Sequence, residues 1–266
     1  MARVSLLGGG RMAEALLTGL LDSGHDASEL AVAEVQPDRR QVLEQRFPGV
    51  RVVPSAAWAA TDAEVVIVAV KPGDVAAMLR GVHDTLPADT LVVSIAAGVT
   101  IATLEGAVPG RPVVRAMPNT AALVREGVAA IAPGQHATEG HLDDAERLLD
   151  AVGTVVRVPE SQLDAVTGLS GSGPAYVFLV AEALIEAGVL VGLPRPTATE
   201  LVVRTLTGSA RMLAESGDGP EELRAAVTSP GGTTAFGLRV LEERGLRAAL
   251  MDAVAAAARR SSELDA

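Results

Sequence analysis

Residues 227–234, in the second half of the chain, have side chains suited to binding a small anion. They read Val-Thr-Ser-Pro-Gly-Gly-Thr-Thr. An apolar helical run ends at Val227, and Pro230 stops that helix because proline has no N–H and disfavours a helical residue before it. The two glycines leave the main chain unobstructed, and the two threonines open the next helix, whose first N–H groups lack partners. We therefore expect a neutral cradle for an anion, most naturally a carboxylate. A helix–turn–helix corner with threonine caps is the alternative.

A glycine-rich motif at the start of the chain is typical of a dinucleotide site. Residues 8–13, Gly-Gly-Gly-Arg-Met-Ala, fit the pattern G-x-G-x-x-A, follow an apolar strand and open a helix. Gly8 permits a tight turn, Gly10 lets a pyrophosphate approach the main chain, and Ala13 allows close packing of helix on strand. A glycine turn without a ligand is the alternative.

The acid that ends the second expected strand bears on the choice of cofactor. Glu34 lies where a carboxylate would bond the adenosine ribose. This favours NAD over NADP, because a 2′-phosphate would meet like charge. Arg39 and Arg40 follow closely, and either could hold that phosphate instead. The sequence therefore leaves NADPH and NADH both open.

Three later strand ends could border the same ligand. Lys71, the only lysine in the chain, follows the central apolar run. Ligands bind at the carboxyl ends of strands in open α/β sheets, so Lys71 could place a cation or donor beside cofactor or substrate. It could equally be a solvated loop lysine. Residues 94–98 and 117–120 could line a nicotinamide pocket or form ordinary strand-end loops.

Other kinds of catalytic site are disfavoured. The chain has no Gly-x-Ser-x-Gly elbow, and its four histidines show no metal spacing, so we predict neither a serine hydrolase nor a metal site. It also has no cysteine, which excludes disulfides and Cys-ligated metals. Gly173 and Pro174 predict a sharp start of a helix, where Ser170 and Ser172 could cap it or face a substrate.

The expected elements change character along the chain. Apolar runs indicate strands at residues 4–7, 29–34, 51–53, 65–70, 91–94, 113–116, 128–132 and 155–158, with helices at 12–21 and 37–47. Strands spaced by helices indicate βαβ units and a mostly parallel sheet. From about residue 162 the periodicity is helical, with helices at 176–191, 196–215 and 246–264. We predict an α/β fold: an N-terminal Rossmann-like doubly wound sheet over residues 1–160 and an all-α domain over residues 161–266.

Composition limits the partners. The formal net charge is -11 and aromatic residues make up 2%, which disfavours nucleic acid, because that partner needs a basic face and stacking rings. Residues 177–193 are the most apolar stretch, but they carry Glu182 and Glu186, so we expect no membrane span. The first residues lead directly into a strand without the layout of a signal peptide. We expect a soluble cytoplasmic protein.

The helical half predicts self-association. The helix expected at residues 176–191 is apolar nearly all round, and a thin helical layer cannot cover it. An intertwined dimer is therefore expected. Glu182 and Glu186 lie one turn apart, and we expect them to face solvent or an arginine of a partner rather than to act in catalysis.

In this order, the motifs resemble pyrroline-5-carboxylate reductase over nearly the full chain. The matching segments are Gly-Gly-Gly-x-Met-Ala-Glu-Ala-Leu, Ala-Val-Lys-Pro, Arg-Ala-Met-Pro-Asn-Thr, Ser-Gly-Ser-Gly-Pro-Ala-Tyr and Val-Thr-Ser-Pro-Gly-Gly-Thr-Thr. The resemblance implies a Rossmann domain and a helical substrate and dimerisation domain that interlocks with a second subunit, in dimers that often form decamers. It also implies reduction of 1-pyrroline-5-carboxylate to L-proline by hydride transfer from NADPH or NADH, the last step of proline biosynthesis.

The same resemblance implies roles for individual residues. The cofactor phosphates would be lined by Gly8, Gly10, Arg11 and Met12 and the ribose by Glu34, while Lys71, Ala97 and Asn119 would lie near the nicotinamide side. Val70 would also bind the cofactor. The substrate would be held by Ser229, Gly231, Gly232, Thr233 and Thr234, with Thr234 nearest its nitrogen. Thr234 and Lys71 are the candidate catalytic residues.

Two other functions fit parts of the pattern. A 3-hydroxyacid dehydrogenase of similar layout would need a catalytic lysine early in the helical half, and the chain has no lysine after Lys71. A non-enzymatic dinucleotide sensor would bind the cofactor without turnover. The fold alone does not separate these functions.

Overall fold

The computed structural model describes residues 2–264. Contacts between Cα atoms divide the chain into two compact units. Unit 1 comprises Met1–Ser172 together with Ala255–Ala266, and unit 2 comprises Gly173–Val254. The last turns of the C-terminal helix therefore pack with the sheet-containing unit, which the sequence does not suggest.

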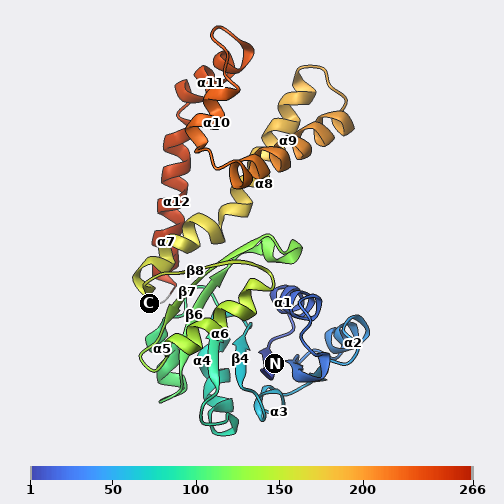
Figure 1. The fold of residues 1–266 in the computed structure, drawn as a ribbon, viewed down its shortest axis with the longest axis vertical. Coiled ribbons are helices and arrows are strands. Elements are labelled where there is room, and N and C mark those ends of the chain that lie inside the picture. The colour runs from blue at the N-terminus through green and yellow to red at the C-terminus, as the bar shows by residue number, and fades with distance from the viewer. Residues whose placement is uncertain (1, 265–266) are drawn as a thin grey trace. The chain divides into compact units, whose positions relative to one another are not determined.

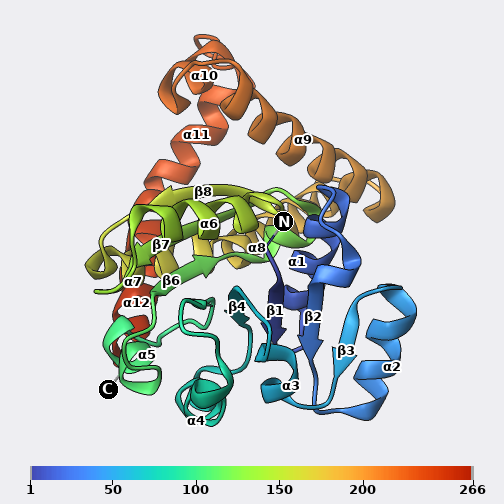
Figure 2. The ribbon, with the colours of Figure 1, turned by 60° about the horizontal axis from the view of Figure 1, so that its bottom comes forward.

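Unit 1 is built on an eight-stranded sheet with the order β3-β2-β1-β4-β5-β6-β7-β8 (Figure 2). The strands are β1 (Val4–Leu7), β2 (Leu30–Ala33), β3 (Arg51–Val53), β4 (Val65–Val68), β5 (Leu91–Ser94), β6 (Val113–Pro118), β7 (Gly127–Pro133) and β8 (Gly153–Arg157). All neighbouring pairs are parallel except β6 and β7, which are antiparallel. The strand order reverses between β1 and β4, and ligands bind at such a reversal in doubly wound sheets.

Helices cover both faces of this sheet (Figure 1). They are α1 (Arg11–Asp22), α2 (Pro37–Arg46), α3 (Ala56–Ala60), α4 (Pro72–Val82), α5 (Ile101–Ala107), α6 (Glu139–Asp150) and α7 (Leu163–Val166). Because side chains alternate along a strand, successive residues of β4 enter different cores. Val65 and Ile67 pack with α1 and α6, whereas Val66 and Val68 pack with α3, α4 and α5.

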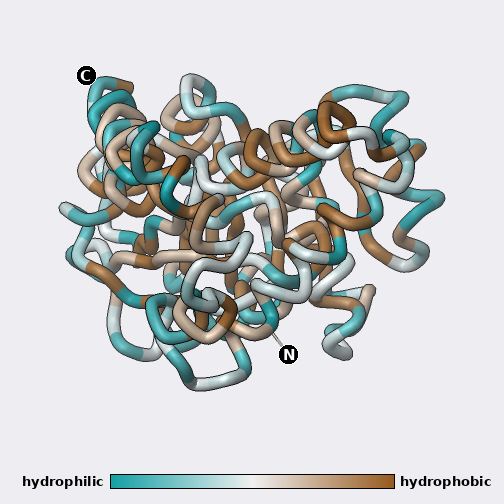
Figure 3. Tube along the Cα trace, turned by 90° about the horizontal axis from the view of Figure 1, so that it is seen from above, coloured by the Kyte–Doolittle hydropathy of each residue, from teal (hydrophilic) through white to brown (hydrophobic). Residues whose placement is uncertain are grey.

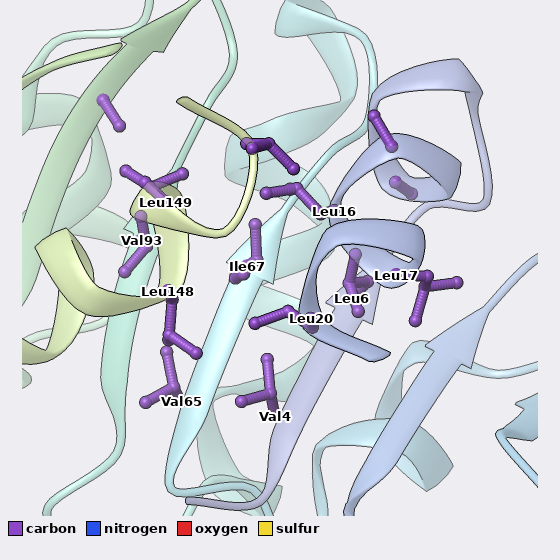
Figure 4. Close-up of a cluster of buried hydrophobic side chains, with 14 of the residues drawn as sticks. Val4, Leu6, Leu16, Leu17, Leu20, Val65, Ile67, Val93, Leu148 and Leu149 are labelled. Atoms are coloured by element: carbon purple, nitrogen blue, oxygen red, sulfur yellow. The ribbon is translucent and has the colours of Figure 1, made fainter. Parts of the chain in front are cut away.

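Figure 4 shows the first of these cores. Leu6 of β1 and Ile67 of β4 point toward Leu16 and Leu20 of α1, and all four side chains are at most 2% exposed. The continuous apolar runs that the sequence analysis assigns to strands are thus buried on both faces, as parallel strands usually are. This packing fixes the carboxyl ends of β1, β2 and β4, where the candidate cofactor residues lie.

Unit 2 is helical. Its helices are α8 (Gly173–Leu190), α9 (Arg195–Glu215), α10 (Pro220–Ala226), α11 (Thr233–Glu243) and the first part of α12 (Leu246–Glu263). Many of its large apolar side chains are exposed in the single chain, with Phe178 and Leu179 on α8 at 68% and 65%. Hydrophobic residues (brown in Figure 3) recur along the coiled, helical segments of the chain.

One helical run, Glu160–Leu190, is long and apolar enough to cross a membrane by length and composition, and none of its most apolar window is buried within the chain. Glu182 and Glu186 lie within this run, and their charges would be costly inside a membrane. Glu186 forms an ion pair with Arg195 at 2.9 Å, and both side chains are exposed. A charged pair of this kind is expected on the surface of a helical unit in water.

The predicted fold class is confirmed: a Rossmann-like sheet is followed by a helical region. Strand positions agree to within about two residues, as expected for element ends. The helix start predicted at Gly173 and Pro174 is confirmed, because α8 begins at Gly173. Residues Thr167–Gly171 form a π-helical turn just before it, in which the Ser172 N–H bonds the Thr167 carbonyl at 2.8 Å. This wider turn ends at Gly171, shortly before the start of α8.

Candidate functional site

Each glycine of the N-terminal motif has a different steric reason to be glycine. Gly8 has a φ of +113°, and a Cβ there would lie 2.6 Å from the Ala69 carbonyl oxygen. A Cβ on Gly9 would lie 2.6 Å from Leu43 Cδ1. Gly10 is different, since a Cβ there would meet nothing within 4 Å. The space beside Gly10 is open, so a ligand can approach the main chain there.

Helix α1 begins directly after this turn and presents its unpaired N–H groups beside the open space. Gly10 is the N-cap and has no side chain to satisfy them. Ala13 is fully buried, which lets the helix pack closely on the sheet. Arg11 is exposed and Met12 packs against the first core. This arrangement suits the negative charge of a pyrophosphate, as the motif predicts.

The Glu34 carboxylate is fixed by main-chain donors. Its Oε2 accepts from the Gly9 N–H at 3.2 Å, and its Oε1 accepts from the Gln36 N–H at 2.9 Å. On the other side of the glycine turn, Arg39 donates to the Gly9 carbonyl at 2.7 Å. Glu34 and Arg39 therefore clamp the glycine turn from both sides, a role that the sequence does not reveal.

A cavity of about 350 Å³ opens at the carboxyl ends of β1, β2 and β4. Its lining brings together three residues singled out in the sequence, Gly8, Glu34 and Val70. The other lining residues are Ala33, Val35, Ala56, Asp74 and Met78. Sequence reasoning missed Asp74, in the first turn of α4, because nothing in its local sequence shows that it lines the same cavity as Glu34. The cavity lies at the reversal of strand order, where a dinucleotide is expected.

Lys71, Ala97 and Asn119 follow different strands. Lys71 is the exposed N-cap residue of α4, and Ala97 lies half-buried in the turn after β5. Neither lines the 350 Å³ cavity. No group of three or more His, Asp or Glu side chains suited to a metal ion occurs in the described part of the chain.

The amide of Asn119 is engaged at both ends. Its Nδ2 donates to the Ser170 carbonyl at 3.2 Å, and its Oδ1 accepts from the Val128 N–H at 3.3 Å. In an α-helix the Ser170 carbonyl would accept from residue 174, but Pro174 has no N–H. The Asn119 side chain therefore replaces a missing helical hydrogen bond and ties the end of β6 to the π-helical turn.

Arg115, in the middle of β6, has a structural role that the sequence did not indicate. It is 5% exposed and pairs with Glu160 at 3.1 Å and Asp164 at 4.0 Å. Asp164 also accepts from the buried hydroxyl of Ser261 at 2.7 Å. The end of α12 is thereby joined to the start of the long helical run within unit 1.

The loop of unit 2 has the predicted local structure. Helix α10 ends at Ala226 and α11 starts at Thr233, with a turn between them closed by a bond from the Gly232 N–H to the Ser229 carbonyl at 3.0 Å. Gly231 has a φ of +68°, which suits the third position of a turn led by Pro230. A Cβ on Gly232 would lie 2.3 Å from Ser229 Oγ, so a side chain there would displace the serine hydroxyl.

The first turn of α11 is free to bind an anion. Its N-cap, Gly232, has no side-chain bond to the helix, and the hydroxyls of Thr233 and Thr234 form no hydrogen bond within residues 2–264. Both threonines are exposed in the single chain. The loop thus presents free N–H and O–H groups together and carries no charge, as the sequence predicts.

Comparisons with known proteins agree with both units. Residues 3–98 match the family model "NADP oxidoreductase coenzyme F420-dependent", and residues 160–264 match "Pyrroline-5-carboxylate reductase dimerisation". The chain is 48% identical to a pyrroline-5-carboxylate reductase from Mycobacterium tuberculosis, over 99% of this chain and 97% of that protein.

Solved structures give the same result. A pyrroline-5-carboxylate reductase from Coxiella burnetii has a TM-score of 0.94 and 36% identity, covering 100% of this chain and 99% of that one. A pyrroline carboxylate reductase from Plasmodium falciparum, solved with NADP bound, has a TM-score of 0.88 and 29% identity, covering 100% and 98%. With near-complete coverage and 48% identity to a curated relative, the chain belongs to the pyrroline-5-carboxylate reductase family of NAD(P)H-dependent oxidoreductases.

Proposed function

We propose how the residues of this chain divide the work of the family's reaction, the reduction of 1-pyrroline-5-carboxylate to L-proline in proline biosynthesis. The cofactor supplies a hydride. The turn at Gly8 and Gly10 and the N-terminus of α1 hold its pyrophosphate, through Arg11 and Met12, and Glu34 holds the adenosine ribose. Val70 borders the cofactor beside Glu34, and Lys71, Ala97 and Asn119 lie on the nicotinamide side, with Asn119 acting through its two structural hydrogen bonds.

The loop between α10 and α11 binds the substrate carboxylate in this proposal. Gly231 and Gly232 leave the main-chain N–H groups open, and Ser229 and Thr233 add hydroxyls. The single observation that carries the proposal is that this turn ends in an uncapped helix N-terminus with two unpartnered threonines. A carboxylate satisfies such a group of donors without a counter-charge.

Thr234 acts on the imine nitrogen. An imine is far more basic than a carbonyl oxygen, so the substrate can bind already protonated and a dedicated acid is not required. The Thr234 hydroxyl then needs only to orient the nitrogen by a hydrogen bond. Most of the acceleration comes from holding the imine carbon and the hydride donor in the reacting geometry. Lys71 supplies a cation near the cofactor or substrate.

The enzyme works as a homo-oligomer, as its match to a dimerisation domain indicates. We further propose an intertwined dimer built on the exposed apolar face of α8, with decamers as a higher assembly, in the cytoplasm. Phe178 and Leu179 are 68% and 65% exposed in the single chain, and a soluble protein rarely leaves such side chains uncovered along a whole helix. We place the boundary between the cofactor domain and the substrate domain at residues 160 and 161.

The test is a spectrophotometric assay combined with ligand binding. The purified enzyme is mixed with 1-pyrroline-5-carboxylate and reduced cofactor, and loss of nicotinamide absorbance is followed. Proline binding is measured separately by calorimetry, for the wild type and for Gly232→Ala. The variant is expected to lose affinity for proline while it still binds the cofactor, because the new methyl group displaces Ser229 Oγ. Equal proline affinities would remove the loop from the substrate site.

A further inference from the structure

We propose that the 350 Å³ cavity receives the adenosine of a dinucleotide without a 2′-phosphate, so that this enzyme selects NADH over NADPH. The inference rests on the proposed dinucleotide site and specifies its chemistry. Glu34 is the specificity-determining residue, and Asp74, which lines the same cavity, reinforces it. The relative from Plasmodium falciparum was solved with NADP, so the selection follows from residues of this chain rather than from the fold.

The charge of the cavity lining carries the argument. Its residues include two carboxylates, Glu34 and Asp74, and no lysine, arginine or histidine. The remaining lining is apolar or glycine. An adenine and a ribose with free hydroxyls suit this surface, because apolar walls cover the base and a carboxylate accepts from the hydroxyls. A phosphate on the ribose would bring negative charge against two acids.

The Glu34 carboxylate cannot turn away from such a phosphate without loss. The N–H groups of Gly9 and Gln36 bond its two oxygens at 3.2 and 2.9 Å. Rotation would leave both donors unpaired and would release the glycine turn on which the pyrophosphate rests. The acid is therefore held in place by the same turn that binds the cofactor.

The two arginines that could hold a 2′-phosphate already have partners. Arg39 bonds the Gly9 carbonyl at 2.7 Å and pairs with Glu14, which also pairs with Arg46 at 2.6 Å. Arg40 donates to the carbonyls of Glu34 and Val35 at 3.0 and 2.8 Å. Neither arginine lines the cavity. The sequence leaves these cations available to a phosphate, whereas in the structure Arg39 braces the glycine turn and Arg40 braces the β2–α2 connection.

The experiment measures binding directly, with no turnover. NADH and NADPH are titrated into the enzyme and followed by nicotinamide fluorescence, and AMP and adenosine 2′,5′-bisphosphate are compared by calorimetry. In each pair, we expect the ligand with a 2′-phosphate to bind roughly tenfold more weakly or worse, because a fixed carboxylate would face that phosphate. The ratio of the two dissociation constants should fall as the salt concentration is raised, because salt screens the repulsion between the carboxylate and the 2′-phosphate.

Three variants locate the cause. Glu34→Gln keeps an acceptor oxygen for one of the two main-chain N–H donors and removes the charge, so the preference for NADH should fall to within about threefold. Asp74→Asn should reduce the preference for NADH less than Glu34→Gln does, because Asp74 only reinforces Glu34. Arg40→Gln should leave the ratio unchanged. A selective loss of NADPH binding in Arg40→Gln would instead make Arg40 a phosphate ligand and overturn the proposal.

The result also separates this inference from the proposed function. Equal affinity of the wild type for NADH and NADPH, at low salt, would overturn the inference and leave the dinucleotide site intact. Failure of every one of these ligands to bind would overturn the site itself. A preference for NADH that persists unchanged in both Glu34→Gln and Asp74→Asn would show that the acids are not its source, which also contradicts the proposal.

Discussion

The three glycines of the N-terminal turn show how the atoms around a position determine which residue type fits there. Gly8 is required by its φ of +113°, Gly9 by the side chain of Leu43, and Gly10 leaves an open surface for a ligand. Only the first and last of these follow from the motif. The reason for Gly9 lies on α2, more than thirty residues away in the sequence, and a local pattern cannot show it.

The proposed role of the Thr234 hydroxyl can be tested by substitution. Thr234→Ala should lower kcat/KM by about 10- to 100-fold, the loss of one hydrogen bond to a charged group in the transition state. Thr234→Ser keeps the hydroxyl and should recover most of the rate. Steady-state kinetics of both variants measure the effect. Equal rates in the wild type and the alanine variant would exclude Thr234 from the mechanism.

The sequence predicts the site where its residues act through the main chain and fails where they act across the fold. The loop at residues 227–234 could be predicted because proline, glycine and threonine have strong local preferences. Asp74, Arg115 and the bracing role of Arg39 could not, since each depends on which side chain lies opposite in the folded protein. Charge and spacing alone do not contain that information.

Among the elements, the connection from the end of β6 to the π-helical turn shows the limit of the local sequence. Gly173 and Pro174 correctly predict where α8 begins. They do not show that a π-helical turn at Thr167–Gly171 precedes it, or that Asn119 donates to the Ser170 carbonyl, which has no N–H of residue 174 to accept from. A compensating side chain from another element cannot be seen in the sequence around the proline.

This connection yields a prediction about stability. Asn119→Ala should lower the free energy of unfolding by about 1–3 kcal/mol, because the Ser170 carbonyl and the Val128 N–H both lose their partner. Asn119→Asp keeps the acceptor for Val128 but sets a carboxylate oxygen against the Ser170 carbonyl oxygen, so it should lower the free energy of unfolding as well. Thr120→Ala, at the exposed neighbouring position, is the control. Urea unfolding at a fixed protein concentration measures all three.

At the scale of the whole molecule, the exposed face of α8 predicts how the chain associates. Phe178→Glu should raise the dissociation constant of the oligomer about a hundredfold or more, because a charge would be buried against apolar surface. Trp58→Glu is a matched control, since Trp58 is 63% exposed but lies on α3, outside the region matched to the dimerisation domain. Sedimentation velocity over a dilution series compares them. Dissociation by both variants alike, or by neither, would remove α8 from the interface.

The contact of the C-terminal helix with unit 1 is equally testable. Ser261→Ala should lower the free energy of unfolding by about 1.5–3 kcal/mol, because Asp164 loses a hydrogen bond next to the buried Arg115. Ser262→Ala removes only a local bond to the Arg259 carbonyl and is the control. Thermal or urea unfolding at equal protein concentration gives the comparison. Identical curves for the two variants would show that the contact adds nothing.

That contact also affects how the chain is made. Ser261 bonds Asp164, and a Cβ on Gly98 would lie 3.0 Å from Leu264 Cβ, so the last residues pack against segments translated long before them. Domains usually fold in order as they leave the ribosome. Here the N-terminal half emerges first, and we expect its packing to be completed only after residues 261–264 have been translated.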